Sequence, residues 1–226
     1  MIKVIAFDGD DTLWDNEIYF REAENWFCGL LEDFLPAHSV ERELLKTELH
    51  NISLYGYGIK AFMLSMIETA VRITDKKIPA EAIEKIVNYG KGLLDKPVHL
   101  IDGVENVLVS LKPKYRLVVA TKGDLLDQER KLKKSGLLDY FHHIEIMSEK
   151  KESDYAKLVK HLDIKPEELM MIGNSLKSDI IPVLNLGGHA IHIPYHVTWA
   201  HEHVDVKIED GNFRQVERIS EVLNFI

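Results

Sequence analysis

Short apolar runs alternate with longer amphipathic stretches over most of the chain. Five short segments are predicted as strands, namely Val4–Phe7, 117–121, His143–Met147, Leu169–Gly173 and 189–194, and the first has the length and β-branched content of a buried strand. A sixth strand is predicted at 204–208. Apolar residues at helical spacing predict helices over Val104–Leu111, 124–135, 153–161, 178–186 and 213–225. Strands that alternate with helices form βαβ units, so these parts of the chain predict an α/β fold with a parallel sheet.

Residues 15–98 interrupt this alternation directly after the first strand. They contain no strand pattern, and their apolar periodicity predicts four helices, over 16–35, 40–53, Ile59–Ile73 and 79–94. Pro36 ends the first helix, and Pro79 suits the first turn of the fourth. The sequence therefore predicts an α/β core of residues 1–14 and 99–226 with an all-helical domain inserted between them.

The composition is that of a globular protein and narrows the choice of partners. Of 226 residues, 46% are hydrophobic and 29% are charged, and the formal net charge is −9. An acidic chain without a basic tract argues against nucleic acid and anionic membranes as partners. Cys28 is the only cysteine, which excludes an intrachain disulfide and a Cys-based zinc site. Acids occur too early for a signal peptide, and no apolar run has the length of a membrane span, so we expect a cytoplasmic protein.

Three acids follow the first strand within four positions: Asp8, Asp10 and Asp11. Like charges repel and carboxylates are costly to desolvate, so this cluster predicts a cationic partner. The carboxyl ends of strands are also where open α/β sheets bind ligands. Asp8 and Asp10 are two positions apart, which on extended backbone directs both side chains the same way. Such a pair suits a carboxylate nucleophile, which can form an aspartyl phosphate, with a neighbouring acid/base.

The sequence DGDDTLW at residues 8–14 resembles motif I of the haloacid-dehalogenase-like hydrolase superfamily, a hydrophobic strand followed by D-x-D-x-T. Three further segments resemble the other motifs of that family, in order and at predicted strand ends: VVAT ending at Thr121, Lys150, and GNSLKSD from Gly173 to Asp179. Lys151 adjoins Lys150, and the spacing to Tyr155 favours Lys150 as the lysine of motif III. The likeness covers the whole chain and implies a Rossmann-like core, with residues 15–98 as a C1 cap.

The resemblance implies a role for each matched residue in the hydrolysis of a phosphate ester. Asp8 would attack phosphorus. Asp10 would protonate the leaving oxygen and then take a proton from the water that hydrolyses the aspartyl phosphate. The groups that would bind the phosphoryl oxygens are the hydroxyl of Thr121, the amide of Lys122 and the ammonium of Lys150.

The resemblance also implies bound Mg²⁺, held by Asp8, the backbone carbonyl of Asp10, and Asp179. Asn174 stands where the family has the first acid of motif IV, which leaves one formal charge fewer at the metal. An amide oxygen can still coordinate a metal or accept a hydrogen bond from a metal-bound water. We therefore expect catalysis to be retained and metal affinity to be lower.

These roles predict a phosphatase acting on a small phosphorylated metabolite. Dehalogenases of the superfamily lack the second aspartate of motif I, so Asp10 argues against a haloacid substrate. Two alternatives stay open. A phosphotransferase such as a phosphohexomutase shares the first half-reaction, and Asn174 alone favours a non-catalytic phosphate-binding or regulatory protein. A phosphonatase needs an imine-forming lysine in the cap; Lys60 could serve, but nothing in the sequence marks it as buried.

Four other features of the sequence are either ambiguous or explained by structure alone. The glycine-containing turn at 55–60 is either a plain connection or a loop that selects the leaving group. The spacing of the histidines at 201–203 favours loop residues over a metal site. The apolar stripes that include Trp26 and Phe27 are predicted as helix-packing core, with a homodimer through one stripe left open. Asp11, where the family often has glycine, is predicted to be an ordinary turn residue.

Overall fold

The first strand of the chain lies at the centre of the sheet. In the computed structural model, which describes residues 1–226, β1 (Val4–Phe7) is fully buried and pairs in parallel with β2 (Arg116–Lys122) and β4 (Leu169–Gly173). A parallel strand covered on both faces is apolar at every position, as the sequence VIAF is. The strand that precedes the clustered acids therefore has neighbours on both sides, and their carboxyl ends surround those acids.

Six parallel strands form one sheet in the order β3-β2-β1-β4-β5-β6. The remaining strands are β3 (His143–Met147), β5 (His189–His192) and β6 (Phe213–Gln215). The predicted α/β fold with a parallel sheet is confirmed.

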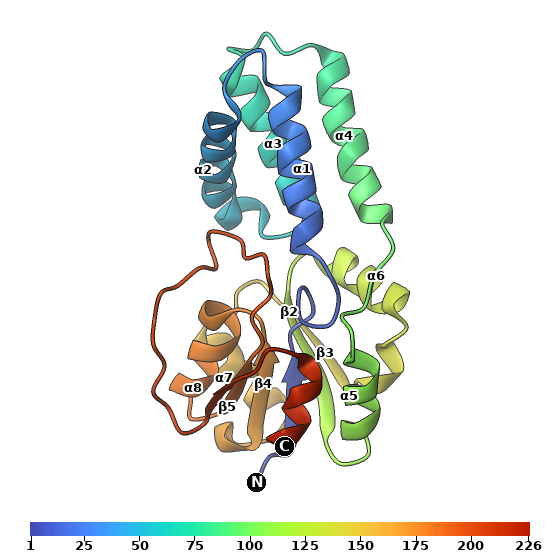
Figure 1. The fold of residues 1–226 in the computed structure, drawn as a ribbon, viewed down its shortest axis with the longest axis vertical. Coiled ribbons are helices and arrows are strands. Elements are labelled where there is room, and N and C mark those ends of the chain that lie inside the picture. Colours follow the sequence, from blue (N-terminus) through green and yellow to red (C-terminus); the bar gives the residue numbers. More distant parts are fainter. The chain divides into compact units, whose positions relative to one another are not determined.

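Alternate residues of the central strand face two separate hydrophobic clusters. Ile5 and Phe7 pack on the side of α5 (Val104–Leu111), α6 (Leu125–Ser135) and the 3₁₀ helix η4 (Ile219–Asn224). Val4 and Ala6 pack on the side of α7 (Glu152–His161) and α8 (Ile181–Asn185). Figure 1 shows these two groups of helices on opposite faces of the sheet. The sheet is thus a middle layer between two groups of helices.

The chain divides into two compact units. The first, named here the α/β unit, comprises Met1–Glu17, Val98–Lys122 and Gln128–Ile226, and the second, the helical unit, comprises Ile18–Pro97 and Gly123–Asp127. The helices that build the helical unit are α1 (Glu17–Leu30), α2 (Ala37–Tyr55), α3 (Ile59–Ile73) and α4 (Ala80–Asp95). They enclose a hydrophobic cluster of their own, which includes Phe27, Phe62 and Met66. Each unit therefore has its own core.

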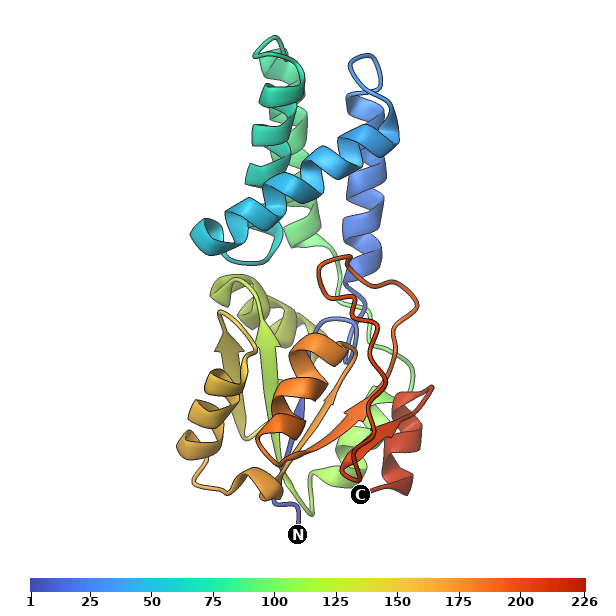
Figure 2. The same cartoon turned by 90° about the vertical axis from the view of Figure 1, so that its left-hand side faces the viewer.

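The predicted sixth strand at 204–208 is wrong, and the predicted helix at 213–225 is only partly right, because Phe213–Gln215 forms β6 and the helical part is the 3₁₀ helix Ile219–Asn224. The loop after β5 carries Glu202 to the carboxyl end of the sheet, where its carboxylate accepts a hydrogen bond from Ser175. A parallel neighbour of β5 must start from the opposite end, so residues 204–208 form the return path, and Phe213 begins the strand opposite Ala190. Figure 2 shows this long loop running back along the sheet before β6.

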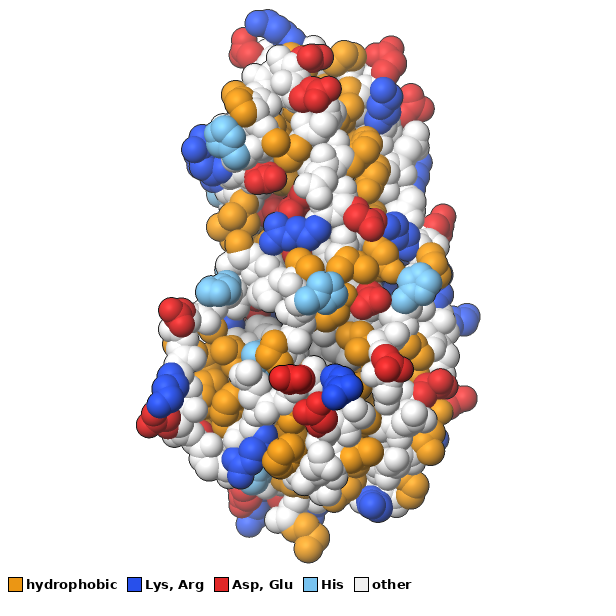
Figure 3. Space-filling model, in the orientation of Figure 1, with side chains coloured by type: hydrophobic (Ala, Val, Ile, Leu, Met, Phe, Trp, Pro, Cys, Tyr) orange, Lys and Arg blue, Asp and Glu red, His pale blue; other side chains and the backbone are white.

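Charged side chains of both signs are mixed on one face of the molecule (Figure 3). On the face drawn in Figure 3, lysines and arginines are scattered among aspartates and glutamates and form no separate patch. None of the helices combines the length and the apolar character needed to cross a bilayer.

Candidate functional site

Three of the predicted site residues meet in a buried ion-pair cluster. Asp8 directly follows β1, Lys150 lies between β3 and α7, and Asp179 lies in the turn after β4. The Lys150 Nζ donates to Oδ1 of Asp8 at 2.5 Å and to Oδ1 of Asp179 at 2.6 Å. All three residues are at most 6% exposed. Lys150 is thus the cation that the acids at the end of the first strand require.

Burial and charge act against each other in this cluster. Burial alone would lower the pKa of the Lys150 ammonium, but the carboxylates of Asp179 and Asp8 raise that pKa above its ordinary value. Burial raises the pKa of Asp8 to about 7, and the attraction of Lys150 opposes this rise. Lys150 therefore stays protonated at neutral pH and is the fixed positive charge of the cluster.

A tight turn holds Asp179 against the end of β4. The Ser175 N–H donates to Oδ2 of Asp179 at 2.9 Å, and residues Leu176–Ile180 form one turn of π-helix. A Cβ at Gly173 would lie 2.3 Å from the same Oδ2 atom. Glycine is required at this position because the Asp179 carboxylate occupies the space of a side chain.

Asp10 has a different set of partners from Asp8. Its Oδ1 accepts hydrogen bonds from Trp14 Nε1 at 2.6 Å and from Lys131 Nζ at 2.9 Å. Its Oδ2 accepts a hydrogen bond from Gln128 Nε2 at 2.8 Å. The carboxylate predicted to act as acid and base is therefore held by Trp14 and by the helix α6, whereas Asp8 is held by Lys150.

Thr121 and Lys122 end β2 next to the loop of the first motif. Thr121 is 1% exposed, and its Oγ1 lies 3.2 Å from the position that a Cβ on Gly9 would take. The Lys122 ammonium donates to Ser178 Oγ at 2.9 Å. The role predicted for Lys122 uses only its backbone amide. Its side chain connects β2 with the turn that carries Asp179.

Glu202 completes this connection from the loop after β5. Its Oε2 accepts hydrogen bonds from Ser175 Oγ and Ser178 Oγ, both at 2.6 Å, and its Oε1 pairs with Lys122 Nζ at 2.5 Å. Burial raises the pKa of Glu202, but Lys122 and the two hydroxyls outweigh burial and lower the pKa to about 2. The ionised carboxylate therefore joins the end of β2, the turn after β4 and its own loop.

Asn174 is connected to Asp8 through one hydroxyl. Thr12 Oγ1 lies 3.3 Å from Oδ2 of Asp8 and 3.4 Å from Oδ1 of Asn174. The backbone carbonyl of Asn174 contacts Nε2 of His192 at 2.9 Å. The amide that replaces the first acid of motif IV is therefore at the site, on the side of the predicted nucleophile.

The donor atoms at this site are of the kind that Mg²⁺ prefers. The predicted ligands are the carboxylates of Asp8 and Asp179 and the carbonyl of Asp10, all oxygen donors. Oδ1 of Asp8 and Oδ1 of Asp179 lie within 2.6 Å of the same lysine nitrogen, so the two carboxylates are close enough to share a small cation. No group of three or more His, Cys, Asp or Glu side chains with a metal-binding arrangement occurs in the chain. Carbonyl and amide oxygens would have to supplement the two carboxylates.

The sequence predictions do not assign roles to Thr12, Gln128, Lys131 or Glu202. Thr12 is the threonine of the D-x-D-x-T pattern, so the motif itself indicates it. Gln128 and Lys131 are polar residues three positions apart on the helix that follows β2, a spacing that places them on one face. Glu202 has no comparable signal because it comes from an irregular loop.

Asp11 is not an ordinary turn residue, which corrects the prediction. Its φ of 64° lies in the left-handed region, which glycine, asparagine and aspartate enter most readily. Its carboxylate is buried and accepts hydrogen bonds from the N–H of Asn16 at 2.9 Å and of Glu17 at 3.0 Å. Asp11 therefore sets the path of the chain from the first motif to the start of α1.

Lys60 and the histidine-rich segment have ordinary partners. Within the helical unit, the half-exposed Lys60 side chain pairs with Asp124 at 2.8 Å. An exposed, ion-paired lysine lacks the desolvation that activates an imine-forming amine. His201 Nε2 lies 3.3 Å from Lys177 Nζ, a cation rather than another metal ligand.

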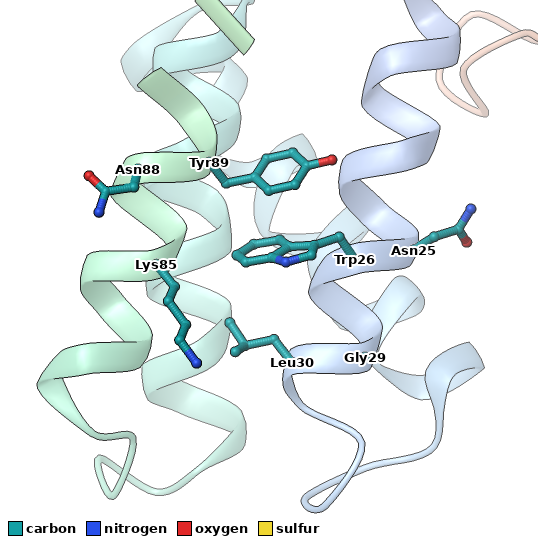
Figure 4. Close-up of a pocket in the computed structure, with 7 residues that line it drawn as sticks. All are labelled: Asn25, Trp26, Gly29, Leu30, Lys85, Asn88 and Tyr89. Carbon is teal, nitrogen blue, oxygen red and sulfur yellow. The ribbon is translucent and has the colours of Figure 1, made fainter. Parts of the chain in front are cut away.

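A hollow of about 620 Å³ lies between α1 and α4 of the helical unit. Trp26 and Tyr89 stack in it, with ring centroids 4.3 Å apart and an angle of 22° between the ring planes (Figure 4). The lining residues are Asn25, Trp26, Gly29, Leu30, Lys85, Asn88 and Tyr89. Phe27 is buried, as predicted for a core residue, whereas Trp26 is only partly buried. None of the predicted site residues lines this hollow.

Comparison with known proteins identifies the family. Residues 2–187 match the family model of the haloacid dehalogenase-like hydrolases, and the chain belongs to this family. A solved haloacid dehalogenase-like family hydrolase from Xanthomonas campestris is 40% identical, with a TM-score of 0.88 over 97% of this chain and 88% of that one. The family predicted from the four motifs is confirmed.

Two curated relatives have phosphatase names. The glyceraldehyde 3-phosphate phosphatase of Methanocaldococcus jannaschii is 30% identical over 199 residues, which cover 83% of this chain and 82% of the relative. The N-acylneuraminate-9-phosphatase of Mus musculus is 32% identical over 93 residues, 39% of this chain and 38% of the relative.

Proposed function

We propose that this chain is a phosphatase that hydrolyses a small phosphorylated metabolite through an aspartyl phosphate on Asp8. The observation that carries the proposal is the buried Lys150 ammonium between Asp8 and Asp179. A carboxylate and a phosphate ester are both anionic, so attack requires a fixed positive charge beside them. The phosphatase names of the two curated relatives support the same reaction.

The residues then act in two half-reactions. A carboxylate oxygen of Asp8 attacks phosphorus, the bond from phosphorus to the leaving oxygen breaks, and Asp10 gives that oxygen its proton. Asp10 next takes a proton from water as the water oxygen attacks phosphorus, and the bond to Asp8 breaks to release inorganic phosphate. Thr121 and the Lys122 amide hold the phosphoryl oxygens. Asp8, Asp179 and the Asp10 carbonyl would hold Mg²⁺, which when bound would supply positive charge to offset the phosphoryl charge.

Asp10 supports a phosphate ester over a haloacid as the substrate. An alcohol leaves as an alkoxide unless it is protonated, whereas a halide needs no proton. Asp10 is present, and Trp14, Gln128 and Lys131 hold its carboxylate. A residue with this role would be idle in a dehalogenase.

The helical unit is proposed to be the C1 cap, which selects the substrate. The loop Gly123–Asp127, which follows the phosphate-binding residue Lys122, groups with this unit. Its Asp124 pairs with Lys60. The backbone N of Asp124 lies 3.3 Å from the position that a Cβ on Gly58 would take. The glycine turn of the cap is therefore tied to the loop that follows β2, which supports a role for residues 55–60 in substrate choice. Glyceraldehyde 3-phosphate and N-acylneuraminate 9-phosphate are the first substrates to test.

Hydrolysis of p-nitrophenyl phosphate with and without Mg²⁺ tests the mechanism. The parent should be active with Mg²⁺, and acid-quenched samples should show a phosphoryl adduct by intact mass. Asp8→Asn should lose both the activity and the adduct. Equal activity of the two proteins would refute the role of Asp8. Inactivity of both, with phosphate still bound, would instead favour a phosphate-binding protein.

Asn174→Asp tests the assignment of the metal site without measuring activity. The substitution restores an acid next to Asp8, and a third carboxylate should bind Mg²⁺ at least ~10-fold more tightly because each added charge strengthens a hard-cation site. Isothermal titration calorimetry of parent and variant measures the difference. Unchanged affinity would place the metal away from Asn174.

A further inference from the structure

We infer that Lys131 and Gln128 are positioning residues for Asp10 and that they act in protonation of the leaving group. The inference rests on the proposed function, in which Asp10 is the acid and base. Neither residue belongs to a motif of the family resemblance, and both lie on α6, one helical turn apart. Together with Trp14, they supply every hydrogen bond that the Asp10 carboxylate is observed to accept.

Lys131 holds the carboxylate and the adjoining backbone segment at once. Its Nζ lies 2.9 Å from Oδ1 of Asp10 and 2.7 Å from Oδ1 of Asn16. The side chains of Lys131 and Asp10 are 15% and 22% exposed, so solvent screens this ion pair only in part. The ammonium therefore fixes Oδ1 of Asp10 between α6 and the residues that follow motif I.

Gln128 links Asp10 to the phosphate-binding strand end. Its Nε2 donates to Oδ2 of Asp10 at 2.8 Å and to the backbone carbonyl of Lys122 at 2.7 Å. Gln128 is 2% exposed, so its amide has little freedom to turn away. Gln128 thus fixes the position of the Asp10 carboxylate relative to Lys122, whose N–H is proposed to hold the phosphoryl group.

This geometry matters for proton transfer more than for substrate binding. A general acid is effective only when its oxygen is held within hydrogen-bond reach of the leaving oxygen, and loss of orientation lowers the rate of that step. Asp10 lies after the end of β1, outside the sheet, where its backbone forms only an isolated β-bridge with Trp14. Within the loop only Trp14 donates to this carboxylate, and α6 supplies the remaining donors, Lys131 to Oδ1 and Gln128 to Oδ2.

Two aryl phosphates of similar size isolate this step. Phenyl phosphate needs a proton on its leaving oxygen much more than p-nitrophenyl phosphate does, because the nitro group stabilises the departing anion. Lys131→Met should lower kcat for phenyl phosphate by about 100-fold, the lower end of the range for general acid catalysis, and leave KM nearly unchanged. For p-nitrophenyl phosphate kcat should fall by no more than about threefold, because departure of p-nitrophenolate depends only weakly on the acid. Lys131→Arg should recover most of the phenyl phosphate activity. Gln128→Leu should show the same split, that is, a much larger loss of kcat for phenyl phosphate than for p-nitrophenyl phosphate.

Lys133→Met is the matched control, since Lys133 is an exposed lysine on the same helix. It should leave both rates unchanged. Equal losses on both substrates in Lys131→Met would indicate a general structural defect and overturn the inference, as would no loss on either. Asp10→Asn is the reference for the proposed function and should show the largest split. If Asp10→Asn shows no split, the acid role of Asp10 fails, a result distinct from failure of Lys131 alone.

Discussion

Lys150 balances two carboxylates that no other side chain is observed to neutralise. Its nitrogen lies 2.5 Å from Asp8 and 2.6 Å from Asp179, and all three groups are nearly inaccessible to solvent. Buried charges of this kind are costly to desolvate, and the cost is offset only while the opposite charge is in place. The same ammonium that would assist attack on phosphorus is therefore also expected to stabilise the folded chain.

In the absence of Mg²⁺, Lys150→Met should destabilise the protein by about 3–5 kcal/mol, because two buried carboxylates would then face each other without a cation. Urea unfolding of parent and variant measures the difference. Lys151→Met, at the exposed neighbouring position, is the control and should change stability by less than about 0.5 kcal/mol. Adding Asp179→Asn to Lys150→Met should restore part of the loss, and a further loss would contradict the charge argument.

At the residue scale, the sequence predicts the motif residues of the site but not their other partners. Asp8, Lys150 and Asp179 could be placed together because each follows a predicted parallel strand, and such strand ends share one edge of the sheet. Lys131 and Glu202 could not, because their partners depend on how a helix and an irregular loop approach that edge. Asp11 shows a third limit, since a positive φ is a property of the backbone path rather than of residue spacing.

At the scale of elements, buried apolar runs were the most predictable part. β1 and β4 begin and end at the predicted residues because polar or turn residues border each apolar run. The segment after β5 was the least predictable. Glu202 holds that loop at the carboxyl end of the sheet, and this single tertiary contact decides where the sixth strand can begin.

The loop anchor predicts a dependence of stability on pH. The charged and polar groups that face Glu202 are Lys122, Ser175 and Ser178, and they hold its pKa at about 2, below the ordinary 4.5. A lowered acid pKa contributes stability above pH 4.5, and this contribution disappears as the pH falls toward 2. The shift corresponds to about 3 kcal/mol at neutral pH.

Glu202→Gln is the variant that measures this contribution. Urea unfolding at pH 7 should show the variant to be less stable than the parent, and the gap should close between pH 5 and pH 2. Glu209→Gln, on the exposed part of the same loop, serves as the control. A gap that is independent of pH would show that the Glu202 charge is not what holds the loop.

Two glycines of α4 allow a matched test of packing in the helical unit. A Cβ on Gly92 would meet no atom within 4 Å, whereas a Cβ on Gly90 would lie 2.7 Å from the Met63 sulfur. Gly92→Ala should stabilise the protein by about 0.5–1 kcal/mol, because alanine loses less backbone entropy in a helix. Gly90→Ala should be less stable than Gly92→Ala by at least ~1 kcal/mol, because Met63 must move. Thermal unfolding ranks the two variants, and the reverse order would contradict the packing.

At the scale of the whole molecule, the two units have separate hydrophobic cores. No residue of Ile18–Pro97 belongs to the clusters on either face of the sheet. The Asp15 N–H donates to the carbonyl of His99 at 3.0 Å, so the ends of the inserted segment start and finish side by side on the α/β unit. The insertion can therefore be removed without separating the parts of the sheet.

A chain in which a short Gly/Ser linker replaces residues 18–97 should still fold its sheet, because both sheet-facing clusters remain complete. Far-UV circular dichroism and a cooperative urea transition measure this. The expected transition is less stable than that of the full chain, since Gly123–Asp127 loses the contact of Asp124 with Lys60. A chain without cooperative unfolding would show that the α/β unit depends on the helical unit.

The central position of β1 has a consequence for synthesis on the ribosome. β1 is made first, yet its two neighbours in the sheet come from residues 116–122 and 169–173. At roughly 5–20 residues per second, this strand of apolar side chains is synthesised several seconds before β2 and longer before β4. During that interval the helices of residues 18–97 emerge with a complete core of their own. The order of synthesis thus allows residues 18–97 to fold while β1, the strand that precedes the proposed nucleophile, is still unpaired.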